Sequence, residues 1–166
     1  MTRPDIIREL AARVVALLGE RSLTIATAES CTGGAVSQAI TSVAGSSAVM
    51  RGAVVAYHND VKSGVLGVSA DTLSAVGAVS EAVVEQMACG VSRVMSTDCA
   101  IATSGVAGPG GGTPEKPVGT VWVAVKAYDI VKTKKLQLCD EGRLRNVENA
   151  TYEALRFMYE TLLGAK

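Results

Sequence analysis

The chain has 166 residues, with equal numbers of acidic and basic side chains, many small aliphatic residues and few aromatic ones. This length fits one domain spanning residues 1–166. A net charge of zero argues against a nucleic-acid-binding protein that relies on phosphate neutralisation, because such proteins present a basic face. No apolar run reaches the ~18 residues of a membrane span and no secretion signal opens the chain, so we expect a cytoplasmic protein that contacts neither nucleic acid nor membrane.

Helical and strand patterns alternate along the chain. The first helix is predicted over Arg3–Leu18, with Thr2 and Asp5 as a capping-box-like pair and Gly19 at its end. Further elements follow from periodicity and turn residues: a strand at 23–28, a helix from Ala35, a strand at 49–57, a short helix at 71–75, a helix capped by Ser80, a strand at 99–103, a loop at 104–119, strands at 121–125 and 130–138, and a helix at about 144–163. This order predicts a three-layer α/β/α domain with a mixed, mostly parallel sheet and one hairpin near the end.

The helix after Ser80 is strongly amphipathic. Its inward face is expected to hold five apolar residues, namely Val84, Met87, Val91, Val94 and Met95. The final strand carries three lysines that suit an edge strand, where charge discourages aggregation: Lys132, Lys134 and Lys135.

The segment Ala28-Glu29-Ser30-Cys31-Thr32-Gly33-Gly34 joins a strand to a helix. A hydroxyl at such a turn lies beside unpaired amides at the positive end of the helix. This geometry suits either an anion site or a serine nucleophile with donors for an oxyanion. The alternative is that Ser30 or Thr32 only caps the helix, while the glycines permit a tight turn.

Two further loops with unusual chemistry follow strands. The first is residues 57–62, Tyr-His-Asn-Asp-Val-Lys, and the second is residues 103–113, in which five of the eight residues 105–112 are glycine. Glycine-rich loops bring backbone amides close to a phosphate, although this one matches no Walker or dinucleotide motif and is equally compatible with a surface lid. Since ligands bind beyond the carboxyl ends of strands in open α/β sheets, we expect these loops to meet the Ser30 turn at one pocket.

A serine nucleophile needs a base, and two candidates lie in the second loop. His58 is the only histidine, with Asp60 nearby, but residues two apart on an extended chain point away from each other. Lys62 is the competing base, provided that burial or positive charge lowers its pKa. Tyr57 is a candidate relay or substrate-orienting residue, and Cys31 is an alternative nucleophile. Lys116 is either a phosphate ligand or a solvated loop lysine.

The cysteine and histidine content argues against a metal site. The four cysteines are widely spaced, without a C-x-x-C pair, and only one histidine is present. Cys89 and Cys99 are expected to be small core residues. We therefore expect no metal and no other cofactor.

Several motifs together resemble one known family. They are residues 27–34 (TAESCTGG), residues 52–57 with Lys62 following, residues 77–80 (GAVS), residues 104–111 (SGVAGPGG) and residues 116–121 (KPVGTV). In this order, over about Ile6 to Leu163, they resemble the C-terminal domain family of the competence/damage-inducible protein CinA, the nicotinamide-nucleotide amidases. The chain is similar to the stand-alone members that lack the other domain of longer CinA proteins.

The resemblance implies hydrolysis of the carboxamide of nicotinamide mononucleotide to nicotinic acid mononucleotide and ammonia, within the recycling of the by-product of bacterial NAD-dependent DNA ligase. On the matching positions it implies Ser30 as nucleophile, with Lys62 and Tyr57 as base or proton relay. We expect the substrate to contact residues of the three loops and the start of the last helix, namely Glu29, Cys31, Thr32, Gly33, Gly34, Thr103, Ser104, Gly105, Gly108, Gly110, Gly111 and Arg143.

One departure from the family concerns Arg143. Members often carry Gly-Asp-Arg near the C-terminus, whereas this chain has Glu141-Gly142-Arg143, which weakens the assignment of Arg143 to a substrate phosphate or a neighbouring subunit. Two other readings stay open: a pyridine-nucleotide-binding module without catalysis, and a cysteine-dependent hydrolase that uses Cys31. We also expect a homo-oligomer.

Overall fold

Five strands form one mixed sheet in the order β2-β1-β3-β4-β5 in the computed structural model, which describes residues 1–165. The strands are β1 (Ile25–Glu29), β2 (Met50–Val55), β3 (Cys99–Gly105), β4 (Thr120–Ala127) and β5 (Ile130–Gln137). β1 pairs in parallel with β2 and β3, whereas β4 runs antiparallel to both β3 and β5. Only β4 therefore points the opposite way, which confirms the predicted α/β class with a mixed sheet and a terminal hairpin.

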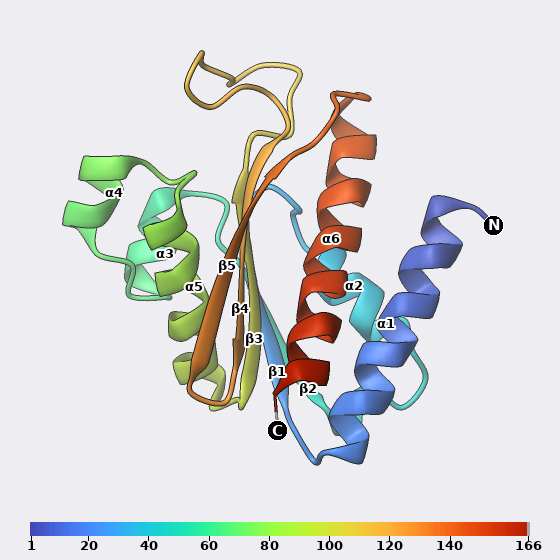
Figure 1. The fold of residues 1–166 in the computed structure, drawn as a ribbon. Coiled ribbons are helices and arrows are strands. Elements are labelled where there is room, and N and C mark those ends of the chain that lie inside the picture. Colours follow the sequence, from blue (N-terminus) through green and yellow to red (C-terminus); the bar gives the residue numbers. More distant parts are fainter. Residues whose placement is uncertain (166) are drawn as a thin grey trace.

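Helices cover both faces of the sheet (Figure 1). One face carries α1 (Arg3–Glu20), α2 (Ala35–Thr41) and α6 (Arg143–Gly164). On the other side lie α3 (Asn59–Gly64), α4 (Ala70–Val76) and α5 (Glu81–Met95), and a single 3₁₀ turn (Ser46–Ala48) precedes β2. The layers are thus the three predicted from the alternation of elements.

Side chains alternate in size between the two faces of the central strands. Ile25, Ile101 and Val123 belong to the core under α1 and α6, whereas Ala26 and Ala100 belong to the core under α5. Successive strand residues point to opposite faces, so the alanines present a flat surface. α5 packs closely on this surface through Val83, Val84, Met87 and Val91.

The predicted start of the first helix is confirmed. Thr2 and Asp5 form a reciprocal capping box at α1, but the helix continues past Gly19 to Glu20. Gly19 and Glu20 extend the predicted helix by two residues, which is the usual uncertainty of a helix end. No other group of residues 1–165 lies within 4 Å of a Cβ built on Gly19, so packing does not force the helix to stop there.

Several local predictions were wrong. Ser80 occupies the N-cap position of α5, yet its hydroxyl donates to the Gly77 carbonyl instead of capping the helix. Val94 is 46% exposed because it lies beyond the sheet-facing stripe of α5. Cys89 is only partly buried. α3 was not predicted, and Ser104 and Gly105 belong to β3 through their pairing with β4.

Three segments distant in sequence reach the same end of the sheet (Figure 1). They are the turn after β1, the loop of residues 106–119 between β3 and β4, and the first turn of α6. This end carries the carboxyl ends of the parallel strands, where α/β proteins place their ligands. Within residues 1–165, no helix has the length and apolar character to cross a membrane.

Candidate active site

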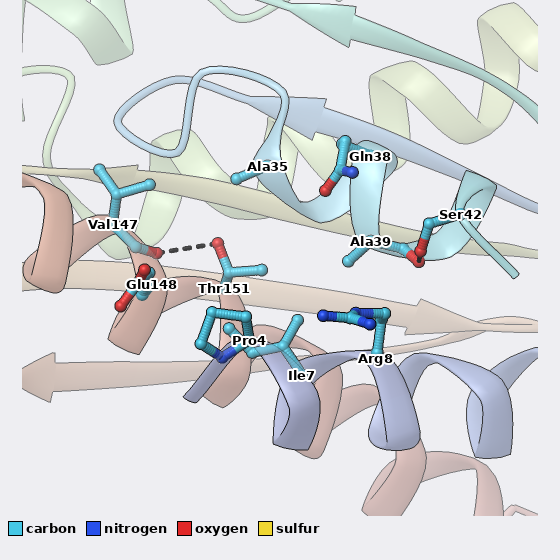
Figure 2. Close-up of a pocket in the computed structure, with 10 residues that line it drawn as sticks. All are labelled: Pro4, Ile7, Arg8, Ala35, Gln38, Ala39, Ser42, Val147, Glu148 and Thr151. Atoms are coloured by element: carbon cyan, nitrogen blue, oxygen red, sulfur yellow. Dashed lines mark hydrogen bonds between the residues drawn. The ribbon is translucent and has the colours of Figure 1, made fainter. Parts of the chain in front are cut away.

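Two cavities of the structure are candidate sites, and the larger of these two lacks reactive groups. It has a volume of about 510 Å³ and lies between α1, α2 and α6. Figure 2 shows apolar side chains such as Ile7, Ala39 and Val147 along this cavity, with the Thr151 hydroxyl turned back to the Val147 carbonyl at 2.8 Å. Arg8 and Glu148 are its only charged lining residues, so this cavity offers no nucleophile paired with a base.

The smaller cavity has a volume of about 310 Å³ and lies at the end of the sheet described above. It is lined by residues of all three predicted loops and of the segment before α5, namely Ser30, Cys31, Tyr57, Asn59, Lys62, Ala78, Val79, Ser104, Gly105, Val106, Ala107, Gly108, Gly110, Gly111 and Arg143. The volume is at the lower end of the range for small-molecule sites. This cavity is the candidate active site.

Ser30 and Lys62 form the centre of the site. The Lys62 side-chain nitrogen lies 3.1 Å from the Ser30 hydroxyl oxygen and donates to the Ala56 carbonyl at 2.8 Å. Lys62 reaches this position because α3 begins shortly after the end of β2. His58 is the N-cap residue of α3, and its side chain accepts from the Asp60 amide. The amine is therefore held by a carbonyl on one side and faces the serine on the other.

Lys62 is buried without a carboxylate partner. Its side chain is 1% exposed, and it forms no ion pair within residues 1–165. Burial lowers the pKa of Lys62 below its ordinary value, because the ammonium form loses its hydration; a negative charge on Cys31 acts in the opposite direction. A lysine with a lowered pKa can accept a proton from a serine.

Cys31 carries no negative charge at neutral pH. Burial raises the pKa of its thiol to about 12, so the thiolate that would favour the Lys62 ammonium is absent near pH 7. The same shift argues against Cys31 as a nucleophile, since the thiolate is the reactive form.

Glu29 does not line the cavity, in contrast to its predicted contact with substrate. Its fully buried carboxylate accepts from the backbone amides of Gly34, Val36 and Ser37 at 2.7–3.1 Å. The Thr32 hydroxyl donates to the same carboxylate at 2.6 Å. Glu29 thus caps the short helix α2 from the preceding strand, where the helix dipole favours a negative charge.

The turn that follows Ser30 leaves amides available to a ligand. Gly33 and Gly34 have positive φ angles of 60° and 103°, a conformation that glycine adopts without strain. The Gly33 amide donates to the Ser30 carbonyl at 3.0 Å, whereas the amides of Cys31 and Thr32 donate to no backbone carbonyl among the turn and loop bonds of residues 1–165 and are directed at the Cys31 thiol. These two amides are the candidate oxyanion donors.

Thr32 of this turn and Thr103 of β3 belong to one buried hydrogen-bond network. The Thr32 and Thr103 hydroxyl oxygens are 2.7 Å apart, and the Ser30 amide donates to the Thr103 carbonyl at 2.9 Å. Five of the residues expected to contact substrate do not line the cavity with their side chains: Glu29, Thr32, Gly33, Gly34 and Thr103.

Arg143 and Tyr57 meet across the mouth of the cavity. The Arg143 guanidinium donates to the Tyr57 hydroxyl at 2.5 Å and to the Gly108 carbonyl at 2.7 Å. Tyr57 is 59% exposed, lines the cavity, and forms no hydrogen bond with Ser30 or Lys62 within residues 1–165. Its role as a proton relay stays a prediction. Arg143 makes no ion pair among these residues, which leaves its charge available to an anion.

Two other predicted groups lie away from the reacting centre. His58 does not line the cavity and instead lies 3.4 Å from the exposed Asp60 carboxylate. Lys116 donates to the Val76 carbonyl at 2.6 Å and ties the glycine loop to the end of α4. No group of three potential metal ligands occurs in the described residues.

Five lining residues were not among the predicted site residues: Asn59, Ala78, Val79, Val106 and Ala107. Ala78 and Val79 form an apolar wall, and Asn59 stands at the first position of α3. Their only sequence signal was proximity to motifs at 57–62 and 77–80.

The fold and the site define a three-layer α/β protein with a buried serine–lysine pair at the carboxyl end of its sheet. Residues 7–162 match the CinA C-terminal domain family, and the chain belongs to this family.

The CinA-like protein of Amoebophilus asiaticus is 42% identical over 160 residues, which is 96% of this chain and 38% of that protein. The CinA-like protein of Kosmotoga olearia is 46% identical over 151 residues, 90% of this chain and 36% of that protein. The chain thus spans less than two fifths of these relatives.

Solved structures of similar length share the fold. The competence/damage inducible protein CihA from Agrobacterium tumefaciens is 41% identical, with a TM-score of 0.92 over 95% of this chain and 96% of that chain. The competence damage-inducible protein A (ComA) from Klebsiella pneumoniae is 37% identical, with a TM-score of 0.93 over 96% and 99% of the two chains.

Proposed function

We propose that this protein is a metal-independent amidase that hydrolyses the carboxamide of nicotinamide mononucleotide. The observation that carries the proposal is the 3.1 Å contact between the hydroxyl of Ser30 and the buried amine of Lys62. A serine activated by a neutral lysine is equipped to attack an amide carbon. The substrate class follows from the resemblance to the nicotinamide-nucleotide amidases.

The proposed reaction begins with transfer of the Ser30 proton to the neutral Lys62 amine as the serine oxygen bonds to the carboxamide carbon. The amides of Cys31 and Thr32 hold the resulting oxyanion; one such donor typically contributes about 2.7–4 kcal/mol. The Lys62 ammonium then gives its proton to the departing nitrogen, which leaves as ammonia. Lys62 then takes a proton from water as the water oxygen bonds to the acyl carbon, and it returns this proton to the Ser30 oxygen as the ester bond breaks and the acid product leaves as its carboxylate.

Arg143 is the proposed phosphate ligand. Its guanidinium has five donors, of which the bonds to Tyr57 and Gly108 occupy two. The amides of the glycine loop stand beside it, and Gly108, Gly110 and Gly111 line the cavity. We expect Arg143→Leu to raise KM for the mononucleotide, while leaving turnover of nicotinamide riboside, which lacks the phosphate, nearly unchanged.

The test combines an ammonia-release assay over a panel of pyridine nucleotides with calorimetry. The account predicts ammonia release from nicotinamide mononucleotide by the wild type, and binding without release by Ser30→Ala. Binding without release by the wild type itself would instead identify a nucleotide-binding module without catalysis.

A further inference from the structure

We propose that Asn59 recognises the carboxamide of the substrate and makes the site prefer an amide over the corresponding acid. This assignment rests on the proposed amidase function. Asn59 lines the cavity, and its side-chain amide forms no hydrogen bond within residues 1–165. Ser30 and Tyr57 also line the cavity, but their hydroxyl groups already accept from Lys62 and Arg143. Asn59 is the lining residue whose neutral polar side chain has no hydrogen-bond partner in this described part of the chain.

The helix α3 places Asn59 beside the reacting centre. Asn59 and Lys62 are three residues apart in this helix, so their side chains lie on the same face. Both line the cavity, and the Lys62 amine is in contact with Ser30. His58 fixes the start of the helix through the Asp60 amide, which holds Asn59 at the cavity wall.

The groups around Asn59 offer mainly hydrogen-bond donors to a ligand. The Arg143 guanidinium and the backbone amides of Cys31 and Thr32 are donors only, and they favour a carboxylate at least as much as a carboxamide. Three nearby carbonyls each already accept one side-chain donor: those of Ala56, Ala78 and Gly108 accept from Lys62, Ser104 and Arg143, respectively.

A substrate carboxamide presents two N–H donors, and it loses affinity where these donors find no acceptor on the protein. Asn59 is an exposed residue of the lining, so its carbonyl oxygen competes with water for these donors. The Asn59 carbonyl oxygen supplies the acceptor. After hydrolysis the product carboxylate has no N–H, so the same oxygen faces a negative charge. Asn59 therefore favours the amide and disfavours the acid product, which is how hydrogen-bonding sites achieve discrimination.

The experiment measures the ratio of two dissociation constants by calorimetry in a Ser30→Ala background, which prevents turnover. The ratio is Kd for nicotinic acid mononucleotide divided by Kd for nicotinamide mononucleotide. We expect Asn59→Leu to lower this ratio by up to roughly 10-fold, the effect of losing one hydrogen bond. Asn59→Asp, which keeps the acceptor and adds charge, should raise the ratio.

Ser63→Ala is the matched control, because Ser63 lies on the same helix and does not line the cavity. It should leave the ratio unchanged. A ratio that stays at the parental value in both Asn59 variants would overturn the assignment, as would an equal loss of affinity for both nucleotides. If the wild type neither releases ammonia nor binds either nucleotide, the proposed function fails and the Asn59 assignment fails with it.

Discussion

The amine of Lys62 and the hydroxyl of Ser30 lie 3.1 Å apart, although the residues are 32 positions apart in the chain and belong to different elements. The Ala56 carbonyl accepts one N–H of Lys62, so the neutral amine can direct its lone pair at the serine. Because no carboxylate pairs with this lysine in the described residues, desolvation is the principal influence on its charge.

The rate should rise with pH through the pKa of Lys62. Only the neutral amine accepts the Ser30 proton, and burial lowers this pKa below its ordinary value of 10.5. A profile of kcat/KM against pH for the wild type should therefore show a rising limb with its midpoint below 10.5. A midpoint at or above that value would contradict the lowered pKa.

Replacing Lys62 by methionine should stabilise the protein at neutral pH while abolishing most activity. The folded-state pKa of Lys62 is lowered, so the unfolded chain binds the proton more tightly, and wild-type stability rises with pH between the folded-state pKa and about 10.5. Below that window the buried ammonium imposes its full penalty, which methionine lacks.

Thermal melts of the wild type and Lys62→Met measure this difference. The Tm advantage of the variant should be largest at low pH and should shrink as the pH approaches 10.5. An advantage of constant size across this range, or a variant less stable at pH 6, would show that burial of the ammonium costs nothing.

Glu29→Gln should destabilise the fold by roughly 2–3 kcal/mol. The carboxylate accepts three backbone amides of α2, and a glutamine nitrogen would oppose donors with a donor. Urea unfolding of this variant measures the loss, and Glu20→Gln at an exposed helix end serves as the control. Equal midpoints for the two variants would exclude Glu29 as the cap of α2.

Cys31→Ala should keep turnover within a few fold of the wild type. The thiol is protonated near neutral pH, since burial raises its pKa to about 12, and the small side chain occupies the cavity wall. Ammonia release measures the outcome. Loss of activity in Cys31→Ala, with Ser30 intact and the fold preserved, would support a cysteine nucleophile instead.

Local patterns predicted the parts of the fold and site that depend on neighbouring residues. The capping box of Thr2 and Asp5, the strand-to-helix turn at Ser30 and the alternation of layers all follow from spacing. Lys62 was identified as a candidate base, but its burial could not be predicted, because burial depends on how α3 packs at the end of β2.

Contacts between segments that are distant in the chain could not be predicted from the sequence. The pairing of Arg143 with Tyr57 joins residues 86 positions apart, and no local pattern indicates it. Glu29 presented the opposite difficulty: a carboxylate beside the nucleophile suggests substrate contact, whereas the alternation along β1 directs it toward the amides of α2. Predicting either contact requires knowing how the helices pack on the sheet.

Ammonia release from nicotinamide mononucleotide by the wild type, Ser30→Ala and Lys62→Met tests the central role of the serine–lysine pair most directly. The account predicts turnover by the wild type, background release by Ser30→Ala, and a loss of roughly 10²–10⁴-fold for Lys62→Met. Wild-type rates in folded Ser30→Ala protein would contradict it.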